Sequence, residues 1–421
     1  MERYSSYKDS GVSWIGEIPE HWEVKQLRSF LTLFTEKEHG DAQLLSVTRE
    51  QGVIERDKED KEENHNFVPE DLSGYKYIEK GDFAINKMKA WQGSFAVSDY
   101  NGIVSPAYFT CKLKDVNKEF FSKAIRSKAY VPFFTQYSKG IRVGQWDLNP
   151  YALKSIPFFL PSPEEQAAIV NYIEEKTSKI DAYVADKEKE IELLQELKQK
   201  TIADAVTKGL NPDAKMKDSG ISWIGEIPEH WEVKKIGSLF VERREKVSDK
   251  EYPALSVSKQ GITPQLDTAV KTDNGDNRKK VCKNDFVVNS RSDRKGSCGV
   301  SPYTGSVSLI NIVLSPRKNI EVQYFHHLFR SNNYIEEYYR IGRGIVADLW
   351  TTRYSEMRNI FVPLPPKDEQ QAIVAYIEEK CEKIDKLASE LQSEIDYLKE
   401  YKQRLIADCV TGQVNVQNEM I

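Results

Sequence analysis

The stretch SGVSWIGEIPEHWEVK, which begins at Ser10, returns as SGISWIGEIPEHWEVK from Ser219. The two copies differ only at Val12 and Ile221, and each copy holds two tryptophans. A match of this length and composition does not arise by chance. The block, called the tryptophan motif below, indicates that the chain contains an internal duplication.

A second block repeats farther along the chain. EEQAAIVNYIEEK starts at Glu164 and DEQQAIVAYIEEK starts at Asp368, and weaker matches lie between the strong ones. The pattern predicts a tandem duplication of a unit of about 205 residues. Each unit has a constant beginning, a variable middle and a constant end, which indicates one shared function and one divergent function.

The constant ends are predicted to be long helices. Ser162 is placed to cap the first one, Glu165 to complete a capping box, and Gly209 to end it. At about 1.5 Å per residue each helix is roughly 65 Å long, and an apolar stripe along it needs a partner. We expect the two helices to pair, although an ordinary helical hairpin that only buries core also explains the stripe. The stripe residues recur at steps of three or four residues, or of two such steps together: Ile169, Ile173, Ile180, Val184, Ile191, Leu194 and Ile202, then Ile373, Ile377, Ile384, Leu391, Ile395, Leu398 and Leu405.

The variable middles, residues 28–157 and 237–361, show short β-like runs separated by turn residues and followed by helical stretches, a pattern typical of α/β domains. The expected fold is α+β: two α/β domains, each followed by a long helix. We expect the helices to pair as an antiparallel coiled coil and the duplication to give a pseudo-two-fold symmetry. The predicted segments are a first domain with its tryptophan motif at 1–160, a first helix at 161–210, a second domain with its motif at 211–362, a second helix at 363–414 and a tail at 415–421.

Composition argues against several classes of protein. No apolar run approaches the roughly 18–20 residues of a membrane span, and the first ten residues do not resemble a signal peptide. The five cysteines form no CxxC pair, and the six histidines do not fall at metal-ligand spacings. We therefore expect a cytoplasmic protein without membrane contact, disulfides or a metal site.

Catalytic signatures are also missing from the sequence. It holds no phosphate-binding loop, dinucleotide fingerprint or nucleophile elbow. The run Asn149-Pro150-Tyr151 resembles the N/D-P-P-Y/F loop of amino methyltransferases, but it has one proline and no glycine-rich methyl-donor motif before it. We predict no catalytic residue and no cofactor in this chain.

Charge is distributed unevenly along the chain, whose formal net charge is −5. Residues 28–157 hold 19 basic against 18 acidic side chains, and residues 237–361 hold 20 against 14, so the acidity lies in the constant parts. In the middles, basic residues accompany amides and tryptophans at loops that contain glycine. Such side chains contact base edges and phosphates, although scattered surface charge remains the alternative for any single residue. The candidates for DNA contact are Lys87, Lys89, Trp91, Gln92, Lys139, Arg142, Gln145, Trp146, Arg291, Arg294, Lys295, Arg343 and Arg353.

The repeated blocks point to a family. SWIGEIPEHW, PSPEEQAAIVNYIEEK and PLPPKDEQQAIVAYIEEK, together with the order domain, helix, domain, helix, resemble type I restriction–modification specificity subunits over essentially the whole chain. The resemblance implies that each variable middle is a target-recognition domain for one half of a split sequence in double-stranded DNA. It also implies that the antiparallel coiled coil spaces the two domains.

The resemblance further implies partner subunits. Two methyltransferase subunits, which carry S-adenosylmethionine and the catalysis, would bind the constant regions, and ATP- and Mg-dependent restriction subunits would join them. A surface offered twice can seat two copies of one partner. A coiled-coil scaffold that binds proteins without reading DNA is the rival hypothesis, and a self-sufficient enzyme is a further one. The candidates either for that repeated surface or for core packing are Trp14, Ile18, Trp22, Trp223, Ile227 and Trp231.

Overall fold

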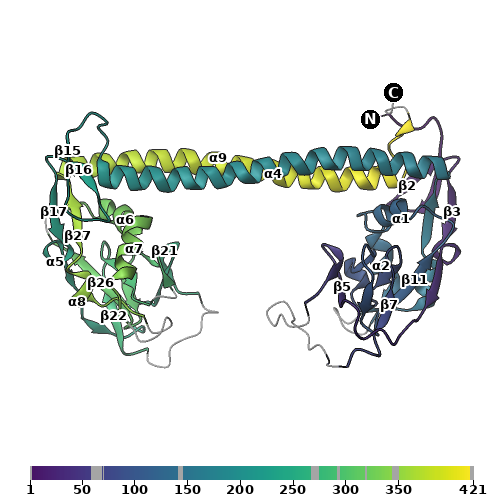
Figure 1. Cartoon of the computed structure of the whole chain (residues 1–421), viewed down its shortest axis with the longest axis horizontal. Coiled ribbons are helices and arrows are strands. Elements are labelled where there is room, and N and C mark those ends of the chain that lie inside the picture. The colour runs from purple at the N-terminus through teal and green to yellow at the C-terminus, as the bar shows by residue number, and fades with distance from the viewer. Residues whose placement is uncertain are drawn as a thin grey trace. The chain divides into compact units, whose positions relative to one another are not determined.

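A computed structural model describes residues 2–57, 69, 71–140, 146–266, 275–291, 294–317, 320–343 and 350–417. The chain divides into two compact units. Unit 1 consists of Met1–Lys187 and Ser393–Ile421, and unit 2 consists of Glu188–Gln392. Each unit therefore combines one variable middle with a part of each long helix (Figure 1).

The duplication is visible in the order of the elements. The first half of the chain contains β1 (Tyr7–Val12), β2 (Gly16–Pro19), β3 (Glu23–Gln26), η1 (Leu27–Ser29), β4 (Leu31–Phe34), β5 (Leu45–Thr48), β6 (Gly52–Glu55), β7 (Lys76–Ile78), β8 (Phe83–Ile85), η2 (Ala90–Gln92), β9 (Phe95–Val97), β10 (Gly102–Val104), β11 (Phe109–Leu113), α1 (Lys118–Ile125), α2 (Val131–Tyr137), β12 (Ser138–Lys139), β13 (Asp147–Leu148), α3 (Pro150–Ser155), β14 (Pro157–Leu160) and the long helix α4 (Pro163–Lys208). The second half contains β15 (Met216–Asp218), β16 (Glu226–Pro228), β17 (Glu232–Lys235), α5 (Ile236–Leu239), β18 (Phe240–Glu242), β19 (Lys246–Val247), β20 (Leu255–Ser258), β21 (Gly261–Pro264), β22 (Arg278–Val281), β23 (Phe286–Asn289), β24 (Cys298–Val300), β25 (Gly305–Val307), β26 (Asn311–Pro316), α6 (Val322–Arg330), α7 (Asn332–Arg340), α8 (Tyr354–Met357), β27 (Phe361–Leu364) and the long helix α9 (Lys367–Val410).

A four-stranded antiparallel sheet forms the centre of each domain, in the order β4-β11-β8-β9 in unit 1 and β18-β26-β23-β24 in unit 2. The strand β8 is apolar at every position because both of its faces are covered. Phe83 and Ile85 face the larger core, to which α1 and α2 contribute, whereas Ala84 faces a smaller core under the β5–β6 hairpin. Side chains alternate in the same way along β23, so the two domains share one framework.

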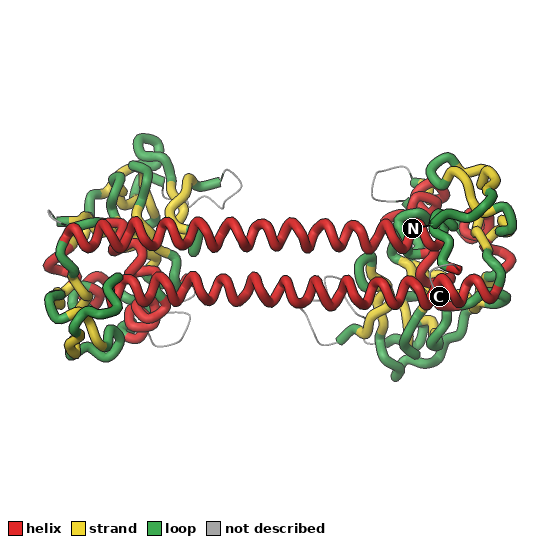
Figure 2. Tube along the Cα trace, turned by 90° about the horizontal axis from the view of Figure 1, so that it is seen from above, coloured by secondary structure: helices red, strands yellow, loops and turns green. Residues whose placement is uncertain are grey.

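The predicted helices form as α4 and α9, and they lie side by side (Figure 2). Within unit 1, Lys402 of α9 lies 2.6 Å from Asp181 of α4. Within unit 2, Lys198 of α4 lies 2.6 Å from Asp385 of α9. The two ion pairs are equivalent: in the first the lysine comes from α9 and the aspartate from α4, and in the second the helices change roles. Such reciprocal contacts are expected at a two-fold interface. The antiparallel pairing is therefore confirmed.

Each long helix ends before a glycine that packs on a tryptophan motif. Gly209 follows α4 with φ +75°, and a Cβ there would lie 3.1 Å from Trp231 Cζ2. Gly412 follows α9 with φ +72°, and a Cβ there would lie 2.3 Å from Pro19 Cδ. The motif of unit 2 comes soon after its helix in the sequence, whereas that of unit 1 lies at the opposite end of the chain. The end of the C-terminal helix α9 therefore packs against the tryptophan motif of unit 1, which comes from the start of the chain.

The structure differs from the prediction at the start of α4. The backbone N–H of Glu165 donates to Ser162 Oγ at 3.3 Å, as expected of an N-cap. The Glu165 carboxylate, however, is buried and accepts hydrogen bonds from Trp22 Nε1 at 3.1 Å and from the Tyr4 hydroxyl at 2.5 Å. The Ser162 cap is therefore present, but the predicted role of the Glu165 side chain in a capping box is wrong, because Tyr4, Trp22 and His21 occupy this carboxylate.

Two expectations from composition can be set against the structure. All five cysteines have free thiols in the structure. Within the described part of the chain, no helix combines the length and the apolar character that crossing a membrane requires.

Candidate nucleic-acid interface

In unit 1, the two loops that hold candidate DNA contacts come together. The backbone N–H of Leu148 donates to the Lys87 carbonyl at 3.1 Å, and the Lys87 ammonium lies 3.1 Å from Asp147. The rings of Trp91 and Trp146 pack with their centres 5.2 Å apart. Candidates that lie far apart in the sequence therefore share one surface.

The other candidates of unit 1 differ in what the structure describes of them. Lys89, Gln92 and Lys139 have exposed side chains. Lys139 lies in β12, opposite Asp147 of β13. Trp91 has a buried indole Nε1 without a hydrogen-bond partner among the described residues. Arg142 and Gln145 lie outside the described residues.

In unit 2, the equivalent segments meet around Thr351. Arg291 and Arg343 each form an isolated antiparallel bridge with Thr351, and both arginines are exposed. Trp350 stands where unit 1 has Trp146, and its Nε1 donates to the Tyr339 carbonyl at 3.0 Å. Two predicted arginines from separate segments thus pair with the same residue, Thr351.

The remaining cations of this surface are engaged to different degrees. Lys295 lies 2.6 Å from Glu336 and 4.9 Å from the ring centre of Tyr339. Arg294 and Arg353 are exposed. An exposed ion pair is worth only about 0–1 kcal/mol, so Lys295 can exchange its glutamate for a phosphate at small cost.

Two further cations balance buried aspartates instead of facing a ligand. In unit 2, Arg243 Nε donates to Asp285 Oδ2 at 2.7 Å, and this bond raises the pKa of Arg243. In unit 1, Lys112 lies 2.9 Å from the equivalent Asp82. Arg243 follows β18, whereas Lys112 lies in β11, so equivalent aspartates are neutralised from different strands. No local sequence signal predicts such pairs, because the partners come from separate strands.

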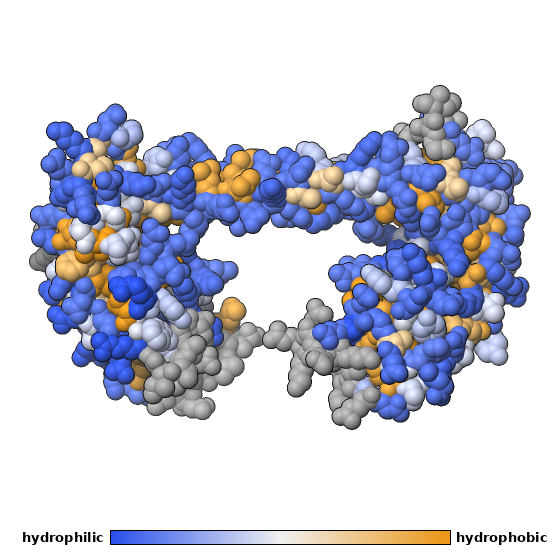
Figure 3. Space-filling view, viewed as in Figure 1, coloured by the Kyte–Doolittle hydropathy of each residue, from blue (hydrophilic) through white to orange (hydrophobic). Residues whose placement is uncertain are grey.

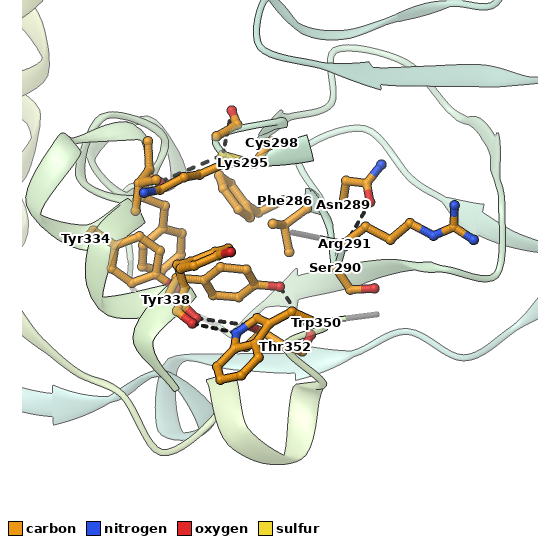
Figure 4. Close-up of a pocket in the computed structure, with 15 residues that line it drawn as sticks. Phe286, Asn289, Ser290, Arg291, Lys295, Cys298, Tyr334, Tyr338, Trp350 and Thr352 are labelled. Atoms are coloured by element: carbon orange, nitrogen blue, oxygen red, sulfur yellow. Dashed lines mark hydrogen bonds between the residues drawn. The ribbon is translucent and has the colours of Figure 1, made fainter. Parts of the chain in front are cut away.

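Next to the arginines of unit 2 lies a narrow hollow that leaves room for about one water molecule (Figure 4). Burial raises the pKa of its Cys298 to about 12, so the thiol is protonated at neutral pH and is no nucleophile. Most of the lining is apolar or aromatic: Phe286, Val288, Gly296, Cys298, Phe329, Tyr334, Ile335, Tyr338, Tyr339 and Trp350. The polar side chains at the hollow are Asn289, Ser290, Arg291, Lys295 and Thr352.

The tryptophan motifs are divided between core and surface. Four of their residues are fully buried in the two large cores: Ile18, Trp22, Ile227 and Trp231. Trp14 is 43% exposed, although its Nε1 donates to the Ala129 carbonyl at 3.1 Å. Trp223 is half-buried against Tyr334, with ring centres 5.7 Å apart. The inner positions of each motif therefore fasten the domain to a helix end, and the first tryptophan keeps part of its ring at the surface.

The adjacent histidines are packed side chains. Burial, together with the nearby positive charge of Arg330, lowers the pKa of His326 to about 3 and that of His327 to about 4. The backbone N–H of Val300 donates to His326 Nδ1 at 3.1 Å, which requires the neutral ring. No group of three His, Cys, Asp or Glu side chains that could hold a metal ion occurs in the ranges that the structure describes.

The run that resembles a methyltransferase loop has a structural role. The Asn149 side chain accepts a hydrogen bond from the Ala152 N–H at 2.8 Å and thereby caps α3. Pro150 occupies the first helical position, where a missing N–H costs nothing. Asn149 is thus accounted for without any catalytic part.

Comparison with known proteins connects this framework to a described domain. A family model described as the type I restriction modification DNA specificity domain matches residues 228–397. The match runs from the second tryptophan motif through the second variable middle and into α9.

Whole-chain comparisons point the same way. The putative type I restriction enzyme MjaX specificity subunit of Methanocaldococcus jannaschii is 24% identical, over 96% of this chain and 96% of that protein. The type I restriction enzyme EcoBI specificity subunit of Escherichia coli is 23% identical, over 72% of this chain and 66% of that protein.

Two solved structures share the fold. One chain, from a study of the assembly and conformational transition of the type I R-M system, superposes with a TM-score of 0.65 at 16% identity, covering 94% of this chain and 99% of that one. The HsdS subunit from Thermoanaerobacter tengcongensis gives a TM-score of 0.50 at 16% identity, covering 94% and 98%. The predicted fold and the predicted resemblance are confirmed.

Proposed function

We propose that the chain is a type I restriction–modification specificity subunit and that it recognises a two-part, asymmetric DNA target for methyltransferase and restriction subunits that assemble on it. The observation that carries the proposal is the pair of equivalent loop surfaces, one in each unit, on a shared framework. Each surface brings basic, amide and aromatic side chains together, which is the chemistry of contacts to phosphates and base edges.

The two surfaces carry different side chains at the positions proposed to contact DNA. Trp91 and Gln92 of unit 1 stand where unit 2 has Arg294 and Lys295. Because the backbone frame is kept while the side chains at the surface change, each unit is suited to a different half-sequence. An asymmetric, split target follows from this arrangement.

The paired helices are the proposed seat of the partner subunits. Exposed apolar side chains occur at matching positions of the two units, and the space-filling view shows apolar residues along the helices (Figure 3). Apolar side chains that face solvent at repeated positions favour two copies of one protein partner. The matching pairs, one residue from each unit, are Leu193 and Tyr397, Leu197 and Tyr401, and Leu387 and Tyr183.

Catalysis is assigned to those partners. Specificity subunits are generally the non-catalytic members of their complexes, and this chain lacks the sequence signatures of a cofactor-binding loop. We propose that S-adenosylmethionine, ATP and Mg bind the partner subunits and that this chain supplies target choice and assembly.

The direct test measures binding of labelled duplex DNA by the full chain, with and without methyltransferase subunits, followed by mapping of methylated adenines. We expect binding and methylation at one split sequence. If the chain assembles with the methyltransferase but the complex does not bind duplex DNA, the protein-only scaffold is the correct reading. Methyl transfer by the isolated chain would instead establish a self-sufficient enzyme.

A replacement of residues 28–157 by the corresponding domain of a relative tests the assignment of one unit to one half of the target. We expect one half of the methylated sequence to change and the other half to stay as it is. The matched control replaces residues 237–361 and should change the opposite half. A single replacement that alters both halves would contradict the assignment.

A further inference from the structure

Unit 1 contains a wide groove between its variable domain and the long helices. Its volume of about 730 Å³ is far larger than the roughly 10–15 Å³ that a single water molecule needs, so the groove admits a polymer strand. The β5–β6 turn, the end of η2 and the corner between α1 and α2 form one side, and α4 and α9 form the other. Gln92 lies in the lining and connects the groove to the surface of candidate DNA contacts.

The lining of this groove is rich in positive charge. Glu50 is the one acidic side chain among the described lining residues, against five cations: Arg49, Lys123, Arg126, Lys128 and Lys402. Exposed ion pairs are weak, so a cation in such a pair can turn to another anion at small cost. Three of the five are in pairs of this kind, at 3.4, 3.1 and 2.6 Å: Arg49 with Glu50, Lys123 with Glu174, and Lys402 with Asp181.

The other two cations lie at the corner between α1 and α2. Neither Arg126 nor Lys128 has a carboxylate within ion-pair distance in the part of the chain that the structure describes. Arg126 is half-buried, and its Nη2 donates to the backbone carbonyls of Arg49 at 3.2 Å and of Glu50 at 2.8 Å. Carbonyl groups occupy the N–H donors without neutralising the charge, and burial lowers the pKa of Arg126. Lys128 is exposed. An anion in the groove would balance both charges.

The duplicated domain carries less charge at the equivalent positions. His327 stands in the place of Lys123, and Asn332 stands in the place of Lys128. Burial holds the pKa of His327 near 4, so its ring is neutral at neutral pH. Arg330, the counterpart of the half-buried arginine in unit 1, keeps its bonds to backbone carbonyls. The arginine therefore belongs to the shared framework, whereas the two lysines are particular to unit 1.

We propose that this groove binds a backbone phosphate of the target DNA, next to the half-sequence that unit 1 reads. The inference rests on the proposed function, because it extends the contact of unit 1 with the recognised duplex. A phosphate supplies the anion that Arg126 and Lys128 lack, and contacts to phosphates position a protein on DNA without reading its sequence. Unit 1 thus holds its half of the target by a sequence-independent contact that the neutral counterparts in unit 2 do not provide.

The test replaces each backbone phosphate of the mapped target, in turn, by an uncharged methylphosphonate. Binding is measured for the complex of the full chain with its methyltransferase subunits. For the wild type, we expect one replacement beside the half assigned to unit 1 to weaken binding about tenfold, because a charge-assisted hydrogen bond is lost.

Lys128→Asn copies the residue of unit 2 and should remove the sensitivity to that one replacement. It should also weaken binding of the unmodified duplex about tenfold, by the same factor for matched and unrelated sequences, and lower the salt slope by about one. Lys118→Asn is the matched control, because Lys118 lies at the other end of α1 and outside the lining. The control should keep the affinity and the sensitivity of the wild type.

Each outcome decides one question. A sensitivity that survives unchanged in Lys128→Asn, or the lack of any such position in the wild type, overturns the proposal and leaves DNA recognition intact. Unchanged DNA binding together with weaker assembly of the methyltransferase subunits also overturns it and assigns the groove to an acidic segment of that protein. Failure of the wild-type complex to bind any matched duplex overturns the proposed function itself. If circular dichroism shows that Lys128→Asn is misfolded, Lys128→Gln decides by the same criteria.

Discussion

Tyr130 and Tyr334 occupy equivalent positions in the two units, but among the described residues the Tyr130 hydroxyl has a hydrogen-bond partner and the Tyr334 hydroxyl has none. The backbone N–H of Phe159 donates to the Tyr130 hydroxyl at 2.9 Å. At the matching position unit 2 has Pro363, which has no N–H, and the Tyr334 hydroxyl is buried without a partner in the described part of the chain. Proline in place of phenylalanine in the strand before α9 therefore leaves the Tyr334 hydroxyl without the hydrogen bond that Tyr130 makes.

This relationship predicts opposite effects of one substitution in the two units. Tyr130→Phe should lower the free energy of unfolding of unit 1 by about 1–3 kcal/mol, because it leaves the Phe159 N–H buried and unpaired. Tyr334→Phe should be neutral or slightly stabilising, because it removes an unsatisfied hydroxyl. Urea unfolding of both variants measures the difference. Equal destabilisation by the two substitutions would contradict the assigned hydrogen bonds.

The exposed cations predict a graded loss of DNA binding. Arg291→Ala and Lys89→Ala should each weaken binding of the target duplex by about 1–3 kcal/mol if the side chain reads a base, and by less if it meets only a phosphate. In the second case the salt dependence of binding should also become shallower. Lys25→Ala, on β3, which among the described strands pairs with β14, is the control. Affinity and salt slope equal to the control would remove that residue from the interface.

The buried histidines predict an acid-sensitive unit 2. Burial holds the pKa of His326 near 3 and that of His327 near 4, below the ordinary value of about 6.5. Between about pH 6.5 and pH 4, the two histidines take up protons in the unfolded chain but stay neutral in the folded chain. The free energy of unfolding therefore falls as the pH drops from about 6.5 towards 4. We expect His327→Gln to make the loss of unfolding free energy between pH 7 and pH 4 smaller by about 1–3 kcal/mol. Denaturant midpoints measured from pH 4 to pH 7 check the slope, and an unchanged slope would show that His327 is protonated in the folded state.

Gly412, which follows α9, predicts that adding a single methyl group at this position strongly lowers the free energy of unfolding. At Gly412 an added Cβ would meet Pro19 Cδ at 2.3 Å and would also require φ +72°. Gly16 has φ +73° with nothing within 4 Å, so Gly16→Ala reports the backbone strain alone, about 1–2 kcal/mol. Gly412→Ala should cost roughly 1–3 kcal/mol more, because the added group overpacks the joint between the helix end and the tryptophan motif. Equal losses in thermal unfolding would mean that the two chain ends do not pack as described.

The fold was largely predictable from the sequence because the duplication exposes it. The apolar stripe predicts α4 and α9 almost to the residue, and the reciprocal ion pairs of Lys402 with Asp181 and Lys198 with Asp385 follow from the same repeat. The period of the apolar residues shows which face of a helix is buried. Because the helix occurs twice in the chain, the second copy is the expected partner of the first.

The candidate site was predictable only in part. Residue type pointed to the loops around Lys87 and Arg291 as candidates for DNA contact, a role that stays a prediction. It gave no sign that Lys112 and Arg243 are committed to buried aspartates. The role of Glu165 was misjudged, because a capping box is a local pattern whereas Trp22 approaches Glu165 from far away in the sequence. The narrow hollow beside Cys298 has no local sequence signal, because its lining comes from β23, β24, α6 and α7.

The continuous helices predict that the spacing between the two halves of the target depends on helix length. The boundary between the units falls after Lys187 in α4 and after Gln392 in α9. Four residues inserted at both places add about 6 Å of helix, slightly more than one turn, so the apolar stripe stays nearly in phase and the contacts within each unit are untouched. On DNA this length corresponds to one or two base pairs at about 3.4 Å per step. We expect the variant to keep both half-sequences and to require a spacer longer by one or two base pairs, which methylation mapping reads directly. The control inserts two residues at each place, which turns the stripe by about 200° and should abolish helix pairing and methylation together. An unchanged spacer in the four-residue variant would show that the helices do not set the distance.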